Sequence, residues 1–151
     1  MPLLATALAC LAMHPGCGGP PVAAPPTLSN FALVYRRSGG LKPMPRKLKI
    51  GPNQVGTMEE LSPGIGRGKG AATIFKVPAS TIKGLRRALG QARFVTLPSP
   101  GTDPSRCADC FSYEIRYRSH EVTFDDVTMS PPLRPVLQRL EAIADAHRPF
   151  H

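Results

Sequence analysis

Two cysteines in the second half of the chain, Cys107 and Cys110, form the motif CADC. Pairs with this spacing exchange thiols and disulfides, bind zinc or form a structural disulfide. A redox motif opens a helix after a strand, whereas this pair follows the proline-rich LPSPGTDPSR and precedes the strand-like FSYEIRY. A zinc site needs two further ligands, and the chain offers the isolated His120, His147 and His151. The pattern therefore favours a structural disulfide, which closes a short loop and stabilises the fold by about 2 kcal/mol.

A second candidate for chemistry is the glycine-rich stretch SPGIGRGKG at residues 62–70. A phosphate-binding loop of the type G-x-x-x-x-G-K-[ST] would need glycine in place of Pro63 and Ser or Thr in place of Gly70. The string GRGKGA also matches G-x-G-x-x-A, but it leads into a strand-like segment and does not open a helix. The stretch, with Arg67 and Lys69, is therefore predicted to be a cationic connection between strands and not a nucleotide site.

The remaining titratable residues show no arrangement typical of catalysis. His120 follows a strand-like segment without an accompanying nucleophile, so we expect an exposed turn residue. Asp125 and Asp126 are expected to cap the end of a strand and not to bind a metal ion. No Ser-His-Asp, Cys-His or paired-carboxylate constellation stands out. The sequence therefore predicts a protein that is not an enzyme and that uses no cofactor or metal.

The amino-terminal residues have the composition of an export signal. The run from Leu3 to Met13 is apolar but too short to span a bilayer core of about 30 Å, and it fits the apolar region of a signal peptide. Cys17 follows this run in PGCGG, which resembles the lipobox of bacterial lipoproteins. We expect residues 1–17 to form a signal peptide that ends in a lipidated Cys17, with Cys10 as the alternative acylation site.

The composition changes after this signal and indicates how the chain is divided. Residues 18–30, GGPPVAAPPTLSN, are rich in Pro and Gly and predict an extended tether. Residues 31–147 are expected to form a single domain. The expected location is the cell envelope, anchored by lipid to a bacterial membrane, and the alternative is a secreted or periplasmic soluble protein.

Positive charge is concentrated in the first half of this domain. Residues 36–93 contain 13 Lys and Arg against two Glu, a formal charge of +11, whereas residues 94–151 carry −2. This half is expected to present a basic surface. Such a surface attracts anionic polymers and anionic membranes. Nucleic acid is not expected as a partner, because the chain has no Trp and no basic motif interleaved with aromatic residues.

Hydrophobic periodicity indicates an α+β domain. Two helices are predicted, one after Pro78 with Ile82, Leu85 and Leu89 on one face, and one that begins at Ser130–Pro131. Strands are predicted at residues 31–37, 45–51, 54–61, 71–77, 111–118 and 121–127. The expected fold is an antiparallel sheet of about four strands plus a C-terminal hairpin, packed against the two amphipathic helices.

The segments YRRSGG, RFVTLP, CFSYEIRYRSHEVTFDD and PPLRPVLQRLEAI together resemble the emfourin family, across roughly residues 31–145. Emfourin is a bacterial inhibitor of thermolysin-like metalloproteases, and the family includes lipoproteins. The resemblance implies an α+β fold and a binding domain that blocks or holds a thermolysin-like metalloprotease or another envelope protein. The shared motifs belong to the scaffold, so they assign no contact residue.

The residues expected to contact such a partner come from the two glycine-containing turns, because glycine permits the close approach of another backbone. Gly39 and Gly40 are also expected to adopt positive φ in the turn that ends the first strand. The alternative function is a basic module that binds an anionic envelope polymer or lipid headgroups. The candidate contact residues are Arg36, Arg37, Ser38, Gly39, Gly40, Arg67 and Lys69.

Overall fold

The structure is a computed structural model, and the part of the chain that it describes comprises residues 31–41, 45–60, 71–103 and 105–149. The predicted signal peptide and tether at residues 1–30, with the candidate lipidation site Cys17, lie outside this part. Arg67 and Lys69, the candidate contact residues of the second turn, also lie outside it.

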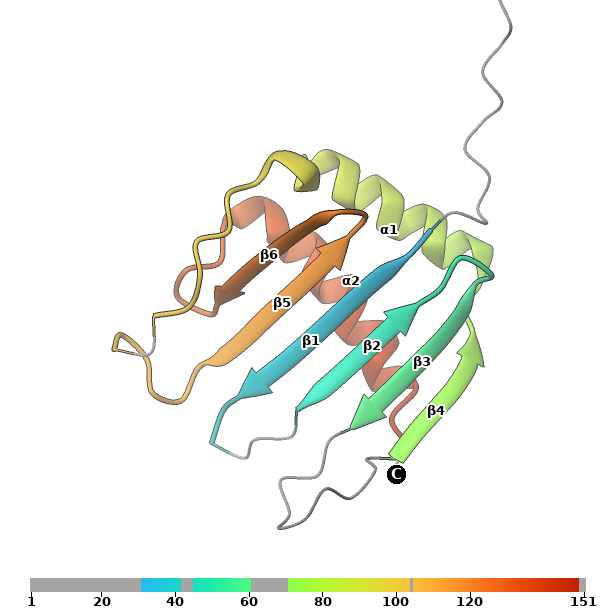
Figure 1. Ribbon diagram of the computed structural model, residues 1–151, viewed down its shortest axis with the longest axis horizontal. Coiled ribbons are helices and arrows are strands. Elements are labelled where there is room, and N and C mark those ends of the chain that lie inside the picture. The colour runs from blue at the N-terminus through green and yellow to red at the C-terminus, as the bar shows by residue number, and fades with distance from the viewer. Residues whose placement is uncertain (1–30, 42–44, 61–70, 104, 150–151) are drawn as a thin grey trace, which may run out of the picture.

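Six strands form one antiparallel sheet in the order β4-β3-β2-β1-β5-β6, with two helices on one of its faces (Figure 1). The predicted α+β class, with four strands, a C-terminal hairpin and two helices, is confirmed. No helix in the described part of the chain is both long enough and apolar enough to cross a membrane. The elements are β1 (Leu33–Gly39), β2 (Arg46–Ile50), β3 (Val55–Glu60), β4 (Ala71–Lys76), α1 (Ala79–Gln91), β5 (Phe111–Tyr117), β6 (His120–Asp125) and α2 (Arg134–Ala146).

β1 lies in the interior of the sheet although it is the first strand along the chain. Tyr35 of β1 is opposite Leu48 of β2 on one side and opposite Ile115 of β5 on the other. The C-terminal hairpin is therefore joined to the three other N-terminal strands through β1. Any surface built on β1 is supported by paired strands on both sides.

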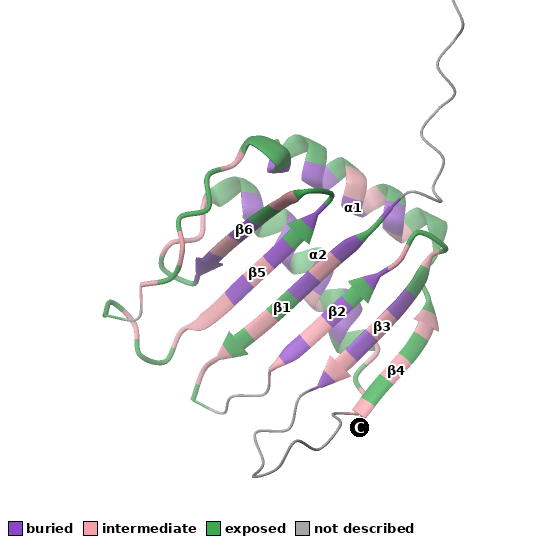
Figure 2. Cartoon of the chain, in the orientation of Figure 1, coloured by how far each residue is buried: buried purple, intermediate pink, exposed green. Residues whose placement is uncertain are grey.

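The two faces of the sheet differ because successive side chains of a strand point in opposite directions. Leu33 and Tyr35 are buried against the helices, while Val34 and Arg36 lie on the other side of β1. Figure 2 shows the same alternation of buried and more exposed residues along the central strands. We call the side away from the helices the open face. It is formed by Val34, Arg36, Ser38, Lys47, Lys49, Thr57, Glu59, Ser112, Glu114, Arg116, Glu121 and Thr123.

α1 packs on the sheet with the face that its periodicity predicts. Ile82, Leu85 and Leu89 are buried, and the intervening polar side chains point away from the core. The helix ends where Arg93 adopts the left-handed conformation, with φ 49° and ψ 42°. The Arg93 N–H donates to the Gly90 carbonyl at 3.0 Å, which satisfies one of the last carbonyls of the helix.

α2 starts later than the sequence predicts. Ser130–Pro131 leads into a 3₁₀ turn at Pro131–Leu133, and the α-helix begins at Arg134. Proline has no N–H, so Pro135 cannot donate to the carbonyl of Pro131, and an α-helix that began at Pro131 would lack a hydrogen bond in its first turn. The Leu133 N–H instead donates to the Ser130 carbonyl at 3.0 Å, as a 3₁₀ turn requires.

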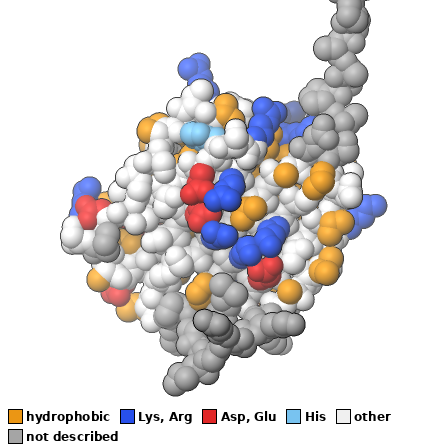
Figure 3. All heavy atoms as spheres, viewed as in Figure 1, with side chains coloured by type: hydrophobic (Ala, Val, Ile, Leu, Met, Phe, Trp, Pro, Cys, Tyr) orange, Lys and Arg blue, Asp and Glu red, His pale blue; other side chains and the backbone are white. Residues whose placement is uncertain are grey.

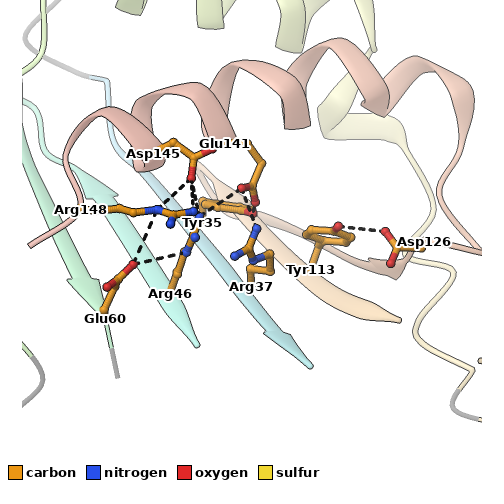
Figure 4. Close-up of polar contacts among 9 residues, drawn as sticks. All are labelled: Tyr35, Arg37, Arg46, Glu60, Tyr113, Asp126, Glu141, Asp145 and Arg148. Atoms are coloured by element: carbon orange, nitrogen blue, oxygen red, sulfur yellow. Dashed lines mark hydrogen bonds and ion pairs between the residues drawn. The ribbon is translucent and has the colours of Figure 1, made fainter. Parts of the chain in front are cut away.

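A buried cluster of charges joins α2 to the sheet (Figure 4). Arg46 of β2 is only 5% exposed, and its Nη1 lies 2.7 Å from Oδ1 of Asp145 on α2. Its Nε lies 3.5 Å from Oε1 of Glu60, which is equally buried on β3. Glu141 of α2 is 3.5 Å from Arg46 and accepts a hydrogen bond from the hydroxyl of Tyr35. Because one guanidinium of β2 contacts an acid of β3 and two acids of α2, it sets where α2 lies on the sheet.

We expect Arg46→Met to lower the free energy of unfolding by about 3 kcal/mol, because it leaves the buried carboxylate of Glu60 with only the more distant Arg148, at 4.0 Å. Urea denaturation followed by circular dichroism measures this change. Adding Glu60→Gln to Arg46→Met removes the unpaired charge, so the double variant is expected to be more stable than the single one.

Arg148→Met is the matched control, since Arg148 contacts the same acids from a more exposed position. Pairs of this kind contribute at most about 1 kcal/mol, so a small loss is expected. Equal losses for the Arg46 and Arg148 variants would show that the buried guanidinium does not position α2.

Candidate functional site

The candidate contact residues at the end of β1 divide between the two faces of the sheet. Arg36 and Ser38 lie on the open face and are exposed. Arg37 points the other way, where its Nη1 lies 2.9 Å from Oε2 of Glu141 and its guanidinium lies over the ring of Phe111 at 4.5 Å. Arg37 is therefore engaged within the domain, and Arg36 and Ser38 remain accessible to a partner.

Gly39 and Gly40 form the turn that the sequence predicts, with φ values of 87° and 83°. A Cβ on Gly39 would lie 2.5 Å from the carbonyl oxygen of Cys110, and one on Gly40 would lie 2.5 Å from the ring of Phe111. The N–H of Gly40 donates to the same Cys110 carbonyl at 3.3 Å. The prediction of positive φ is confirmed, and close packing against the next strand adds a second reason for glycine. We call Ser38, Gly39 and Gly40 the glycine turn.

The predicted disulfide between Cys107 and Cys110 is present, with the two Cα atoms 5.4 Å apart. It lies in the loop before β5, and Cys110 is the residue that contacts the glycine turn. Two motifs that are 70 residues apart in sequence are thus brought together. The disulfide restrains the loop against which the turn packs.

A shallow groove of about 460 Å³ lies on the open face next to the glycine turn. Its lining includes Arg36, Ser38 and Lys47 from β1 and β2 and Ser112 and Glu114 from β5. The Nη1 of Arg36 is 3.1 Å from both carboxylate oxygens of Glu114. The groove therefore offers hydroxyl groups and an ion pair that could hydrogen-bond a polypeptide.

Charges of both signs alternate across the open face, and Figure 3 shows them gathered near its middle. Lys47 lies 3.2 Å and Lys49 lies 3.6 Å from the carboxylate of Glu59, and Arg116 pairs with Glu121. The basic surface expected from residues 36–93 is therefore not found on this face. Arg37 and Arg46 point to the helices and the other cations of β1 and β2 are paired with acids.

His120 is not the exposed turn residue that the sequence predicts. It is the first residue of β6 and is half-buried, with Nε2 2.9 Å from the carbonyl oxygen of Leu97 and its ring edge-on to Phe94. The actual two-residue turn is Arg118–Ser119, because Tyr117 pairs directly with His120. No hydrogen bond in the described part of the chain joins this histidine to a Ser, Cys or Asp side chain.

Asp125 and Asp126 hold loops in place at the end of β6. Asp125 accepts backbone hydrogen bonds from Asp103, Thr128 and Val127, and these hold its pKa at about 2. Asp126 accepts from the Phe111 N–H and from the hydroxyl of Tyr113. Burial, with this hydrogen bond, raises the pKa of Tyr113 well above its usual range.

Metal ligands are not gathered in the described residues. No three His, Cys, Asp or Glu side chains there lie together as a metal site would require. The groove on the open face, next to the glycine turn, is the part of this end of the sheet that could receive another molecule.

Two features of this surface were not predicted. Leu41, which directly follows the glycine turn, is 82% exposed, and the sequence signals it only as an apolar residue next to two glycines. Glu114 lies opposite Arg36 because of the register between β1 and β5. Strand alternation places Glu114 on the polar side of its strand, but nothing local identifies its cross-strand partner.

We expect Gly39→Ala to lower the free energy of unfolding by more than about 1 kcal/mol, because a left-handed conformation with a Cβ costs about that much before the contact with Cys110 is counted. Thermal unfolding measures the loss. Gly90→Ala in α1 is the control, since its added Cβ has nothing within 4 Å and alanine is the better helix former by about 0.5–1 kcal/mol. A Gly39 variant as stable as the wild type would contradict the turn geometry.

Asp125 should make stability depend on acid pH. Its folded pKa of about 2 is below the ordinary 3.8, so its contribution is complete above pH 3.8 and is lost as the pH falls toward 2. The difference in melting temperature between the wild type and Asp125→Asn is expected to shrink across that interval, measured by calorimetry. A difference that stays constant with pH would show that the Asp125 charge has no such role.

The comparisons with known proteins bear on this geometry. No curated protein matches the chain. The Emfourin family model matches residues 63–141, which is just over half of the 151 residues. The match takes in β4, α1, β5, β6 and the first part of α2, and it leaves out β1, β2, β3 and the glycine turn. The chain therefore belongs to the emfourin family.

Proposed function

We propose that the protein binds and blocks a thermolysin-like metalloprotease. Membership of the emfourin family carries this proposal, because the resemblance of this sequence to emfourin implies an inhibitor. The described residues support a binding role because acids at the candidate site, among them Glu114, Asp125 and Asp126, are engaged in structural hydrogen bonds and ion pairs.

The glycine turn with Leu41 is the part of the surface that we assign to the protease cleft. An inhibitor that enters a protease must present its backbone without being cut, and a backbone held rigid resists cleavage. The turn continues the interior strand β1, and the Gly40 N–H bonds to Cys110, which the disulfide restrains. Leu41 offers an apolar anchor at the end of this rigid support, and buried apolar anchors contribute most to an interface.

The open face would lie beside the cleft and give the rest of the interface. Its charges are largely paired within the domain, as between Arg36 and Glu114. Paired charges steer a partner weakly and add little that salt can screen. Inhibition is therefore expected to persist at high salt.

We also propose that the chain is exported and lipid-anchored through Cys17. This rests on the apolar run and the lipobox-like PGCGG. Another protein of the cell envelope is the alternative target.

The test is to titrate the full chain against a thermolysin-type metalloprotease at low and at high salt. We expect stoichiometric inhibition at both salt concentrations. Leu41→Asp is expected to raise the inhibition constant at least about tenfold without a change in melting temperature, because it would place a charge in an apolar pocket.

Val95→Asp is the matched control, because Val95 is 48% exposed in the 3₁₀ turn Phe94–Thr96, at the other end of the sheet from the glycine turn and off the open face. This variant should inhibit like the wild type. Mass spectrometry of the mixture should show the chain intact. Failure of the folded, uncut wild type to inhibit would refute the proposal, and equal effects of the two variants would refute the assignment of the turn.

A further inference from the structure

A second groove, of about 440 Å³, lies at the other end of the sheet from the glycine turn. It is bounded by the C-terminal end of α1, the 3₁₀ turn Phe94–Thr96 and the turn between β5 and β6. That end of the sheet also holds the start of β1, because Leu33 pairs with Tyr117 (Figure 1). We call this feature the arginine groove.

Three arginines line the arginine groove, and none of its lining residues is acidic. Arg86 belongs to α1, Arg93 lies just after the end of α1, and Arg118 lies in the turn between β5 and β6. The guanidinium of Arg86 lies 5.5 Å from the centre of the Phe31 ring, and that of Arg118 lies 5.3 Å from the Tyr117 ring. Three arginines from three separate segments thus line one depression.

The floor and rim of the groove are apolar. Phe94 is buried, with its ring edge-on to Tyr117 at 6.3 Å. Val95 on the rim is 48% exposed. The groove therefore combines positive charge with hydrophobic surface, and it suits a ligand that is both anionic and apolar.

The backbone conformations of Arg93 and Arg118 add an independent observation. Their φ values are 49° and 57°, in the left-handed region that glycine occupies with least strain. Arg93 follows the end of a helix and Arg118 is in a two-residue hairpin turn, both places where glycine is favoured. Strained residues of this kind are concentrated at functional sites. Both of these arginines line the same groove although they are 25 positions apart.

We propose that the arginine groove binds the phosphate group of an anionic phospholipid in a membrane surface. The guanidinium groups would hold the phosphate, and the apolar floor and Val95 would contact the glycerol and upper acyl chain. The position favours a membrane over an acidic protein, because Arg86 of the groove contacts Phe31, and the proposed lipid anchor Cys17 is only 14 positions before Phe31 in the chain. This binding is separate from protease inhibition, since the glycine turn lies at the opposite end of β1.

The test is flotation of the mature chain that the sequence predicts, residues 17–151 carrying Cys17→Ser, with vesicles of phosphatidylcholine with and without phosphatidylglycerol. Neither the apolar run Leu3–Met13 nor an acyl group is then present. Binding is expected only with phosphatidylglycerol. Arg93→Gly combined with Arg118→Gly should weaken it about 25-fold, at about fivefold for each arginine. The same variant should melt at a higher temperature, because glycine relieves the left-handed strain. A loss of binding therefore cannot come from unfolding.

The matched control is Arg87→Gln combined with Arg134→Gln, which removes two exposed charges outside the groove. It should bind vesicles nearly as well as the wild type. Equal losses in the two double variants, or binding without phosphatidylglycerol, would overturn the proposal. Two soluble competitors extend the test. If glycerol 1-phosphate binds the protein more strongly than the vesicles do, the ligand is a soluble phosphate ester instead. If polyglutamate does so, the ligand is an acidic protein.

Discussion

The buried guanidinium of Arg46 is the constraint on which the arrangement of the domain depends. It occupies the helix side of β2, in line with Leu48 and Ile50, where water cannot solvate it. A buried charge is tolerated only with partners, and Arg46 finds them in Glu60 on the next strand and Asp145 on α2. Helix and sheet are thereby held in one relative position. Because α2 and α1 both cover this side, the opposite side of the sheet is left for binding.

The interior strand β1 connects the two proposed binding surfaces. Its last residue, Gly39, belongs to the glycine turn, and its first residue, Leu33, pairs with Tyr117 beside the arginine groove. A strand with neighbours on both sides is a rigid support, and sites held by rigid elements lose less entropy when they bind. A domain attached at its amino terminus could thus contact a membrane at one end and a protein at the other.

The two surfaces use left-handed backbone in different ways. Gly39 and Gly40 adopt it at low cost, and the absence of Cβ atoms lets the turn pack against Cys110 and Phe111. Arg93 and Arg118 adopt it at a cost, with side chains that reach the groove. The glycines are explained by packing within the domain, whereas no acid in the described part of the chain pairs with Arg93 or Arg118, and Arg118 contacts the Tyr117 ring. The family match covers Arg93 and Arg118 but not the glycine turn.

The sequence by itself determined the local features of this protein. Alternation predicted the strand at 111–118, helical spacing predicted the buried face of α1, and the glycine and cysteine pairs predicted the turn and the disulfide. These features follow from the short backbone repeat of strands, helices and turns, and that repeat can be recognised from residues that are close together in the sequence. Only the tertiary structure decided which side chains from different elements contact one another. Arg46 is two residues before Leu48 and four before Ile50, so strand alternation indicates that it points inward. Only the fold brings Glu60 and Asp145 to it. The pairing of Arg36 with Glu114, the burial of His120 and the meeting of the distant arginines in one groove likewise depend on strand order and register, which no local pattern contains.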